Sequence, residues 1–296
     1  MLETKTPEQV PTQEALQEHI RRVSKKKTNW WVYLLLTLGL VLVVAPFIWM
    51  LLSSFKTPGE ITRTPPTWIP EVSTLENYIK LFQQLNFPLY FMNTVIIAGS
   101  VTILNLLFCS MLGYALAKLR FTGKSFLFLL VLGTLMVPGS VTLVPLFILM
   151  SKLHLINTLT AVILPTAAGA FGVFLMRQFM LGIPDELLDA GRVDGASEFF
   201  LYWRIVLPLA TPALATLTIL TFLASWNDFL WPLVVLTSDQ KYNLQVAIAT
   251  FATGQHSSDN GLLLAGAVVV VVPVIVIFLL LQRYFTQGIA LTGLKG

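Results

Sequence analysis

The chain has 296 residues, of which 55% are hydrophobic and only 11% are charged, and its mean hydropathy is +0.76. Soluble domains carry roughly a quarter of charged residues, so this composition excludes an ordinary water-soluble domain, and it excludes a disordered chain as well. A net charge of +4 on an otherwise apolar chain points to membrane topology before it points to nucleic acid.

Six apolar stretches without a charged residue follow one another along the chain. Each is near or above the roughly 20 residues that a helix needs to cross a bilayer. A barrel strand alternates apolar and polar residues, and these stretches do not, so they predict an all-α, polytopic membrane protein with six transmembrane helices. The stretches are 30–52, 91–117, 125–150, 155–176, 205–227 and 262–281.

Prolines occur within most of these stretches. They are compatible with kinks that a helix bundle tolerates, and equally with bends that shape a pore or let it move. The prolines are Pro46, Pro138, Pro145, Pro165, Pro212 and Pro273.

The distribution of positive charge predicts the orientation. Placing the N-terminus in the cytoplasm puts 14 of the 19 lysines and arginines in inner segments and 5 in outer loops, so both termini are expected inside. The first stretch is too long for a signal peptide and is expected to remain as an anchor. In the tail before it, Leu16, Ile20 and Val23 fit a short helix on the inner membrane surface, and an unstructured tail fits as well.

Residues for metal or nucleotide chemistry are missing from the sequence. The three histidines, His19, His154 and His256, lie far apart, and the single Cys109 cannot form an internal disulfide. Gly123-Lys124-Ser125 resembles the end of a phosphate-binding loop, but the glycine that this motif needs is Lys118 here. We therefore expect no metal, no cofactor and no enzyme activity of the chain itself.

The apolar stretches also lack buried ionisable residues, which proton- or ion-coupled carriers keep near the middle of the membrane. Asp228, near the outer end of the fifth stretch, comes closest. A stand-alone secondary carrier is therefore disfavoured, and an intramembrane enzyme lacks a matched set of reactive groups. Energy for uphill transport is expected to come from a partner.

One long polar loop, residues 178–208, separates the fourth and fifth stretches on the inner side. Pro184 and the acidic residues after it predict a helix to about Val193, and Asp194-Gly195 predicts a turn. A second helix is expected to end at Leu207-Pro208, with an apolar stripe of Phe199, Tyr202, Trp203 and Val206. Small residues at the turn admit another backbone, although an amphipathic loop that covers the helix ends would share this spacing.

The loop resembles the EAA motif of binding-protein-dependent ABC importer permeases, roughly E-A-A-x-x-D-G-A followed by I-x-L-P. The matching residues are Asp189-Ala190-Gly191-Arg192-Val193-Asp194-Gly195-Ala196 and Ile205-Val206-Leu207-Pro208. Asp189 replaces the usual Glu, and Gly191 replaces an Ala. Segments 54–60, 113–117, 226–232 and 282–296 are similar to carbohydrate permeases of the maltose type, and the whole resembles the second, six-helix subunit of that pair.

The resemblance implies a type I ABC importer permease fold with a cytoplasmic tail at 1–29, a six-helix domain at 30–285 and a cytoplasmic tail at 286–296. It implies ATP-driven import of a sugar or oligosaccharide across a bacterial cell membrane, with glycerol phosphate or a uronate oligosaccharide as the alternative solute. The implied partners are a second permease subunit, a homodimeric or heterodimeric cytoplasmic ATPase that binds ATP and Mg²⁺, and an extracytoplasmic solute-binding protein. Membrane lipid is a further partner, and nucleic acid is not.

The resemblance also assigns site residues. The turn that docks on the ATPase would comprise Asp189, Ala190, Gly191, Asp194, Gly195 and Ala196, with Asp189 pairing with a group on the ATPase. Phe199, Trp203 and Pro208 would anchor the loop to the bundle.

Candidate residues for the solute path follow from the chemistry of sugars, which bind to aromatic faces and to hydrogen-bonding side chains. Residues 226–231 supply both kinds near the outer end of the fifth stretch, where an aromatic belt with a polar cap is the alternative. The candidates there are Trp226, Asn227, Asp228 and Trp231, and those in the second stretch are Asn93, Thr94 and Asn105.

Overall fold

A computed structural model describes residues 30–84, 86–253 and 259–292 of the chain, and the regular secondary structure in these residues is helical. The chain divides into two compact units, Met1–Trp49 and Met50–Gly296. The helix considered for Leu16, Ile20 and Val23 lies outside the described residues.

The first unit contains most of α2 (Trp30–Ser53), a helix of 24 residues without a charged side chain. Apolar residues occupy every side of this helix, which is the pattern of a segment surrounded by lipid or by other spans. Pro46 lies inside the helix. The first predicted span is thus confirmed as a continuous helix of membrane-crossing length.

The second unit begins at the end of α2 and continues through α3 (Pro58–Ile61) and α4 (Glu76–Gln84). Asn77 in α4 is buried, and its Nδ2 donates hydrogen bonds of 2.8 Å to the carbonyl oxygens of both Ser54 and Lys56. One amide therefore ties α4 to the chain that leaves α2.

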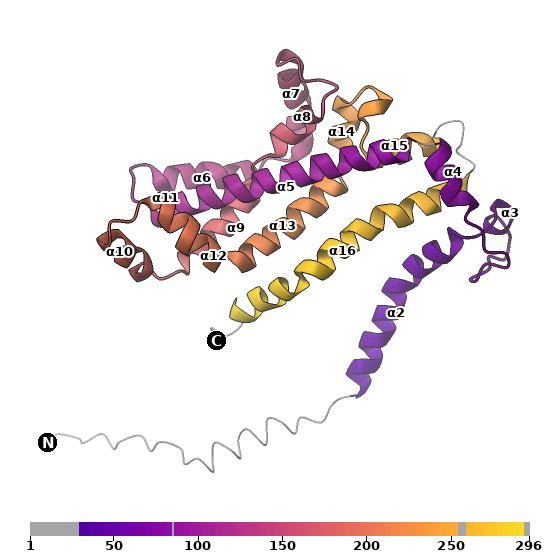
Figure 1. Cartoon of the computed structure of the whole chain (residues 1–296), viewed down its shortest axis with the longest axis horizontal. Helices are drawn as coiled ribbons and strands as arrows, with labels where there is room; N and C mark the ends of the chain where they lie inside the picture. Colours follow the sequence, from indigo (N-terminus) through magenta and orange to yellow (C-terminus); the bar gives the residue numbers. More distant parts are fainter. Residues whose placement is uncertain (1–29, 85, 254–258, 293–296) are drawn as a thin grey trace, which may run out of the picture. The chain divides into compact units, whose positions relative to one another are not determined.

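The core of the second unit lies where α5 (Phe87–Lys118) packs against α9 (Ala170–Leu181) and α13 (Thr211–Trp226), and α5 runs through most of this unit (Figure 1). The side chains that meet there are sulfur-containing and aliphatic. They include Cys109 of α5, Val173 and Met176 of α9, and Leu217 of α13.

The third predicted span is broken, which corrects the expectation of one helix over 125–150. Helix α6 (Lys124–Leu135) and helix α7 (Gly139–Lys152) meet at an angle of 102°. The break falls at Pro138, which lacks a backbone N–H and disfavours helical geometry at the preceding Val137.

The fourth predicted span begins and ends later than the expected 155–176. Helix α8 (Leu159–Ile163), a 3-10 turn (Leu164–Thr166) that contains Pro165, and α9 together form an apolar segment of 23 residues. Pro165 therefore lies at a change of helix type.

The fifth span bends by 78° near Ala210, where α12 (Leu207–Leu209) gives way to α13. Pro208 was expected to end the preceding helix, but the helix continues to Leu209, because a proline is tolerated in the first turn of a helix. Four helices are long and apolar enough to cross a membrane, or up to six if each bent pair is one span, so the described chain is consistent with six spans.

Two groups of shorter helices lie at opposite ends of the second unit. Helices α10 (Glu186–Val193) and α11 (Glu198–Leu201) gather with α12 at one end, whereas α4 and α15 (Leu244–Thr253) lie at the other (Figure 1).

A short helix, α14 (Leu230–Val235), and a 3-10 turn (Asp239–Lys241) lead to α15, and the chain finishes with α16 (Asn260–Thr292). Helix α16 continues past the predicted tail boundary at 285, and residues 293–296 lie outside the described part of the chain.

Candidate functional site

The turn after α10 forms as the Asp194-Gly195 pair predicts. Gly195 has a φ of +81°, a left-handed conformation that costs a side-chain-bearing residue energy. Its N–H donates to the carbonyl of Arg192 (3.0 Å), and the N–H of Ala196 donates to the carbonyl of Gly191 (2.9 Å). These two bonds are the paired bonds of a Schellman motif, so the glycine closes the end of α10.

Helix α10 has one attached face and one free face. Leu188 is fully buried, and a Cβ placed on Gly191 would lie 2.5 Å from Cδ2 of Leu201 in α11. On the other face, Ala190 and Asp194 are exposed and Val193 is 87% exposed. Gly191 was expected to admit a partner, but in this structure its missing side chain makes room for Leu201.

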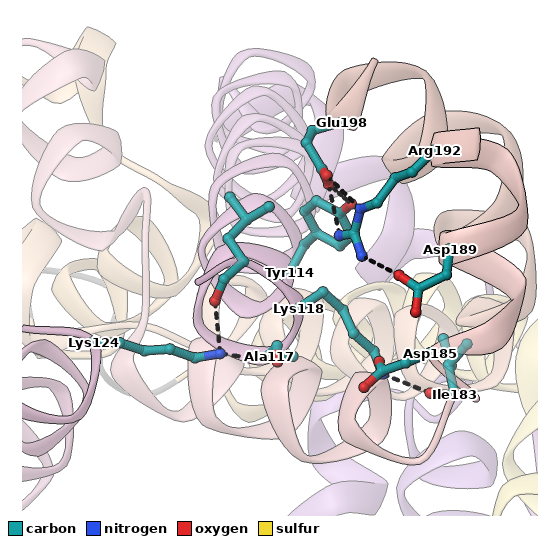
Figure 2. A network of polar contacts seen from close by, with 10 residues as sticks. Tyr114, Ala117, Lys118, Lys124, Ile183, Asp185, Asp189, Arg192 and Glu198 are labelled. Carbon is teal, nitrogen blue, oxygen red and sulfur yellow. Dashed lines mark hydrogen bonds and ion pairs between the residues drawn. The ribbon is translucent and has the colours of Figure 1, made fainter. Parts of the chain in front are cut away.

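A network of ion pairs ties α10 to α11 and to α5 (Figure 2). The guanidinium of Arg192 contacts both carboxylate oxygens of Glu198, at 2.7 and 3.3 Å, and its Nη1 donates to Oδ1 of Asp189 at 2.8 Å. The hydroxyl of Tyr114 in α5 donates to Glu198 at 2.5 Å. Glu198 therefore joins three helices, with bidentate geometry on the Arg192 side.

This network changes what can be expected of Asp189. Its carboxylate was predicted to pair with a group on another subunit, but in the chain it accepts a hydrogen bond from Arg192 one turn later. Hydrogen bonds to Glu198 and then to Asp189 raise the pKa of Arg192 above its ordinary value. The charge at the centre of the network is thus permanently present and shared by two carboxylates.

A second tie joins the end of α5 to the segment that enters α10 (Figure 2). Lys118, whose side chain is 4% exposed, donates from Nζ to the carbonyl of Ile183 (2.5 Å) and to Oδ1 of Asp185 (2.6 Å). The hydrogen bond from Lys118 holds the pKa of the Asp185 carboxyl below its usual value. The sequence gives no local signal of this tie, because Lys118 is separated from Ile183 and Asp185 by 65 and 67 residues.

Lys124, at the start of α6, satisfies the last carbonyl groups of α5. Its Nζ donates to the carbonyl of Ala117 (3.0 Å), drawn in Figure 2, and to that of Leu119 (2.9 Å). A cation at a helix C-terminus is favourable because the helix dipole is negative there. A basic residue soon after a predicted span could have signalled this cap.

The apolar stripe of the second helix is divided. Phe199 is 63% exposed and Trp203 is 42% exposed, whereas Leu201, Tyr202 and Val206 are buried. Phe199 lies before the π-helical turn of Tyr202–Val206 and Trp203 lies within it, and both are exposed, whereas the predicted stripe assumed that the four residues share one buried α-helical face. The packing on the bundle is therefore made by Leu201, Tyr202 and Val206, and not by Phe199 and Trp203 as predicted.

A cavity of about 520 Å³ lies between α5, the segment from α8 to α9, and α13. Its volume is within the usual range for small-molecule pockets. Most of the lining is aliphatic. The polar side chains and the aromatic ring that line it are Asn105, Thr166, Thr221, Ser225, Asp228 and Phe171.

The two tryptophans predicted for the solute path belong to the packed interior, which corrects their assignment. Trp226 is 1% exposed, and its Nε1 donates to the carbonyl of Val270 at 3.0 Å. Trp231 is also buried and donates to the carbonyl of Ala161 at 3.0 Å. A buried indole usually satisfies its N–H in this way.

The predicted polar residues of the second span are buried as well. Nδ2 of Asn93 donates to the carbonyls of Gln240 (3.1 Å) and Tyr242 (3.0 Å). The hydroxyl of Thr94 accepts a hydrogen bond of 2.8 Å from the N–H of Leu244. These side chains hold the 3-10 turn and the start of α15 against α5, so neither lines the cavity.

Three predicted path residues remain. Asn227 is exposed and donates to the carbonyl of Leu223 (2.9 Å), but it does not line the cavity, whereas Asp228 does. Asn105 lines the cavity while its amide bridges the carbonyl of Thr166 (2.6 Å) and the N–H of Gly169 (2.9 Å). The cavity wall therefore retains Asp228 and Asn105 of the predicted set.

Comparisons with known proteins identify the family to which the chain is similar. A family model described as "Binding-protein-dependent transport system inner membrane component" matches residues 109–291. The chain is 43% identical over 279 residues to the arabinooligosaccharides transport system permease protein AraQ of Halalkalibacterium halodurans, covering 92% of this chain and 100% of that protein. It is 34% identical to the lactose transport system permease protein LacG of Rhizobium radiobacter, covering 87% and 93% of the two chains.

The fold is also found in a solved structure. A crystal structure of a bacterial ABC transporter involved in the import of the acidic polysaccharide alginate contains a chain that superposes with a TM-score of 0.76. The two sequences are 23% identical, and the match covers 94% of this chain and 100% of the other. At this identity the likeness confirms the fold alone.

Proposed function

The chain belongs to the family of binding-protein-dependent transport system inner membrane components, and we propose that it forms one half of the path through which an ATP-driven importer takes up a carbohydrate. The names of two similar proteins support this solute class, because AraQ belongs to an arabinooligosaccharide system and LacG to a lactose system. The proposal covers sugars and oligosaccharides.

The observation that carries the proposal is the attachment of α10. The helix is fixed to α5 through Glu198 and Lys118, while Ala190, Val193 and Asp194 stay exposed on its other side. A segment held in this way can pass a displacement to the spans, because packed and bonded groups that form a contiguous network carry coupling between distant sites. A loosely attached loop would absorb the same displacement.

The proposed partner at the free face of α10 is a cytoplasmic ATPase, which binds ATP and Mg²⁺. A second permease subunit completes the path, and a solute-binding protein delivers the carbohydrate on the outer side. The α10 end is assigned to the cytoplasm because inner segments carry most of the lysines and arginines. With this assignment both termini are cytoplasmic.

The test replaces Val193 with Glu in the assembled transporter. Val193 is 87% exposed, so the substitution should leave the fold intact while placing a charge at the docking face. We expect the ATPase to be lost during purification of the membrane subunits, and ATP-dependent carbohydrate uptake into proteoliposomes to fall at least roughly tenfold, as for a loss of about 1.4 kcal/mol of coupling.

The matched control is Leu75→Glu, which adds the same charge at an exposed apolar residue before α4, at the opposite end of the second unit. This variant should retain the ATPase. Wild-type ATPase retention and uptake in the Val193→Glu complex would contradict the docking face, and uptake that needs no ATP would contradict the proposed function.

A further inference from the structure

Helix α13 presents a polar edge to the cavity. Thr221 and Ser225 line it at positions i and i+4 on one side of the helix, and Asp228 lines it from the chain just after the helix ends at Trp226. At a rise of 1.5 Å per residue, the two hydroxyl-bearing residues are about 6 Å apart along the helix. Two hydroxyls and a carboxylate in a row can bond to several hydroxyl groups of one extended ligand.

The cavity lies deep along the helices, so leaving these polar side chains without water or a polar ligand would cost free energy. Asn105 lies 13 residues before Lys118 in α5, which places the cavity wall about 20 Å along the helix from its α10 end. A hydrocarbon core is about 30 Å thick, so this wall is at membrane depth. Asp228 lines the same cavity nearer the outer end of the span, and a carboxylate within or close to the hydrocarbon core is expensive to expose to lipid and normally marks a water-filled cavity or a functional site.

The rest of the lining supplies the apolar part of a sugar site. Phe171 at the start of α9 is about half exposed and lines the cavity, together with aliphatic side chains from α5, α8 and α13. A carbohydrate has hydroxyl edges and apolar C–H faces. The ring of Phe171 can pack against such a face while the polar side chains of this edge bond to hydroxyls. This is the combination of aromatic and hydrogen-bonding side chains that the sequence predicted at residues 226–231.

We propose that this cavity contacts the carbohydrate during transport, and that Asp228 makes the contact selective for neutral sugars over anionic ones. The inference rests on the proposed function and narrows its solute class. Asp228 is the charged residue among the 15 that line the cavity. A carboxylate accepts hydrogen bonds from sugar hydroxyls and repels uronate carboxylates and phosphate groups, and this repulsion is strong where water is scarce.

The first arm of the test measures the charge of the cavity. Cys109 is fully buried and donates weakly to Asn105 and Gly169, so Cys109→Ser supplies a cysteine-free background that keeps a donor. In this background Ser225→Cys places a thiol in the cavity, and Ser151→Cys places a control thiol at an exposed site outside it. The complete transporter is then labelled with a cationic and with an anionic methanethiolsulfonate.

We expect the thiol at position 225 to react, and the ratio of its cationic to anionic labelling rates to fall roughly tenfold when Asp228→Asn is added. The ratio at position 151 should not change. A thiol at position 225 that resists both reagents, or a ratio that Asp228→Asn leaves unchanged, overturns the inference.

The second arm measures solute selection with arabinotriose, lactose, digalacturonate and sn-glycerol 3-phosphate. We expect ATP-driven uptake of a neutral sugar, which also slows labelling at position 225. Preferred uptake of digalacturonate, or uptake of a neutral sugar that never slows labelling, overturns this inference and leaves the proposed import function standing. Preferred uptake of sn-glycerol 3-phosphate overturns both this inference and the proposed carbohydrate class. If none of the four is transported while ATP is hydrolysed, both the proposed carbohydrate class and this inference fail.

Discussion

Polar side chains are used in opposite ways at the α10 end of the second unit and around the cavity. At the α10 end they pair with one another, as Arg192 does with Glu198 and Lys118 does with Asp185. Around the cavity and in the packed interior beside it, the bonds are neutral, such as those from Asn105 to the carbonyl of Thr166 and from Trp226 to the carbonyl of Val270. The desolvation cost of an ion pair is low where water reaches it, whereas at membrane depth neutral donors and acceptors cost less free energy to bury than charges do.

The largest expected effect tests the structural part of this contrast. Trp226→Ala should lower the free energy of unfolding by roughly 3–5 kcal/mol, because it empties a packed site between Phe91 and Phe222. The destabilisation is measured as the drop in thermal midpoint, taken from the size of the monodisperse peak in size-exclusion chromatography after heating.

Trp226→Phe is the closest variant, since it keeps an aromatic ring at this site but loses the hydrogen bond to Val270 and part of the indole volume, at a smaller cost of about 1–3 kcal/mol. An unchanged thermal midpoint in Trp226→Ala together with a raised KM for uptake would instead place Trp226 in the solute path.

A smaller effect is expected at the attached face of α10. Gly191→Leu should destabilise the complex by roughly 1–3 kcal/mol, because the new side chain collides with Leu201. Ala190→Leu, one residue earlier and exposed, should leave the thermal midpoint of the membrane subunits unchanged when they are measured without the ATPase that is proposed to meet this face. Adding Leu201→Ala to Gly191→Leu should restore part of the loss, and equal destabilisation by the two leucines would show that α10 has no preferred face.

The smallest effect concerns pH. Because Lys118 lowers the pKa of Asp185, the stabilisation by this pair is fully present above the pKa of an unfolded aspartate and is lost as the pH falls through the lower native pKa. Asp185→Asn should therefore flatten the decline of thermal stability from roughly pH 6 to pH 3. Glu186→Gln, the neighbouring exposed acid, is the control, and an identical acid slope in wild type and Asp185→Asn would count against the pair.

Local signals were sufficient for the elements around α10. The turn at Gly195 depends on a single residue with a left-handed φ, and the start of α10 follows Pro184 and Asp185, so the sequence indicates both. The apolar stretches likewise indicate the spans, because length and absence of charge are properties of the chain alone.

Side-chain direction at the helix ends could not be predicted in the same way. Whether Trp226 faces a cavity or the interior depends on the 78° bend near Ala210 and on the contact with Val270, which is 44 residues away. The partners of Lys118 and Tyr114 are also distant in the sequence. Tertiary contacts of this kind leave no periodic trace in a single sequence, and helical spacing alone does not indicate that Phe199 and Trp203 stay exposed while Tyr202 and Val206 are buried.

The π-helical turn also affects the relative orientation of the α10 end and the cavity. In Tyr202–Val206 the N–H of Leu207 reaches back to the carbonyl of Tyr202, so the turn holds one residue more than an α-helix needs. Each residue advances an α-helix by about 100°. Deleting one residue here would therefore rotate α10 by about that angle around the helix axis, relative to the helix that follows. The length of this short segment therefore sets the angle between the end proposed to meet the ATPase and the wall that holds Asp228.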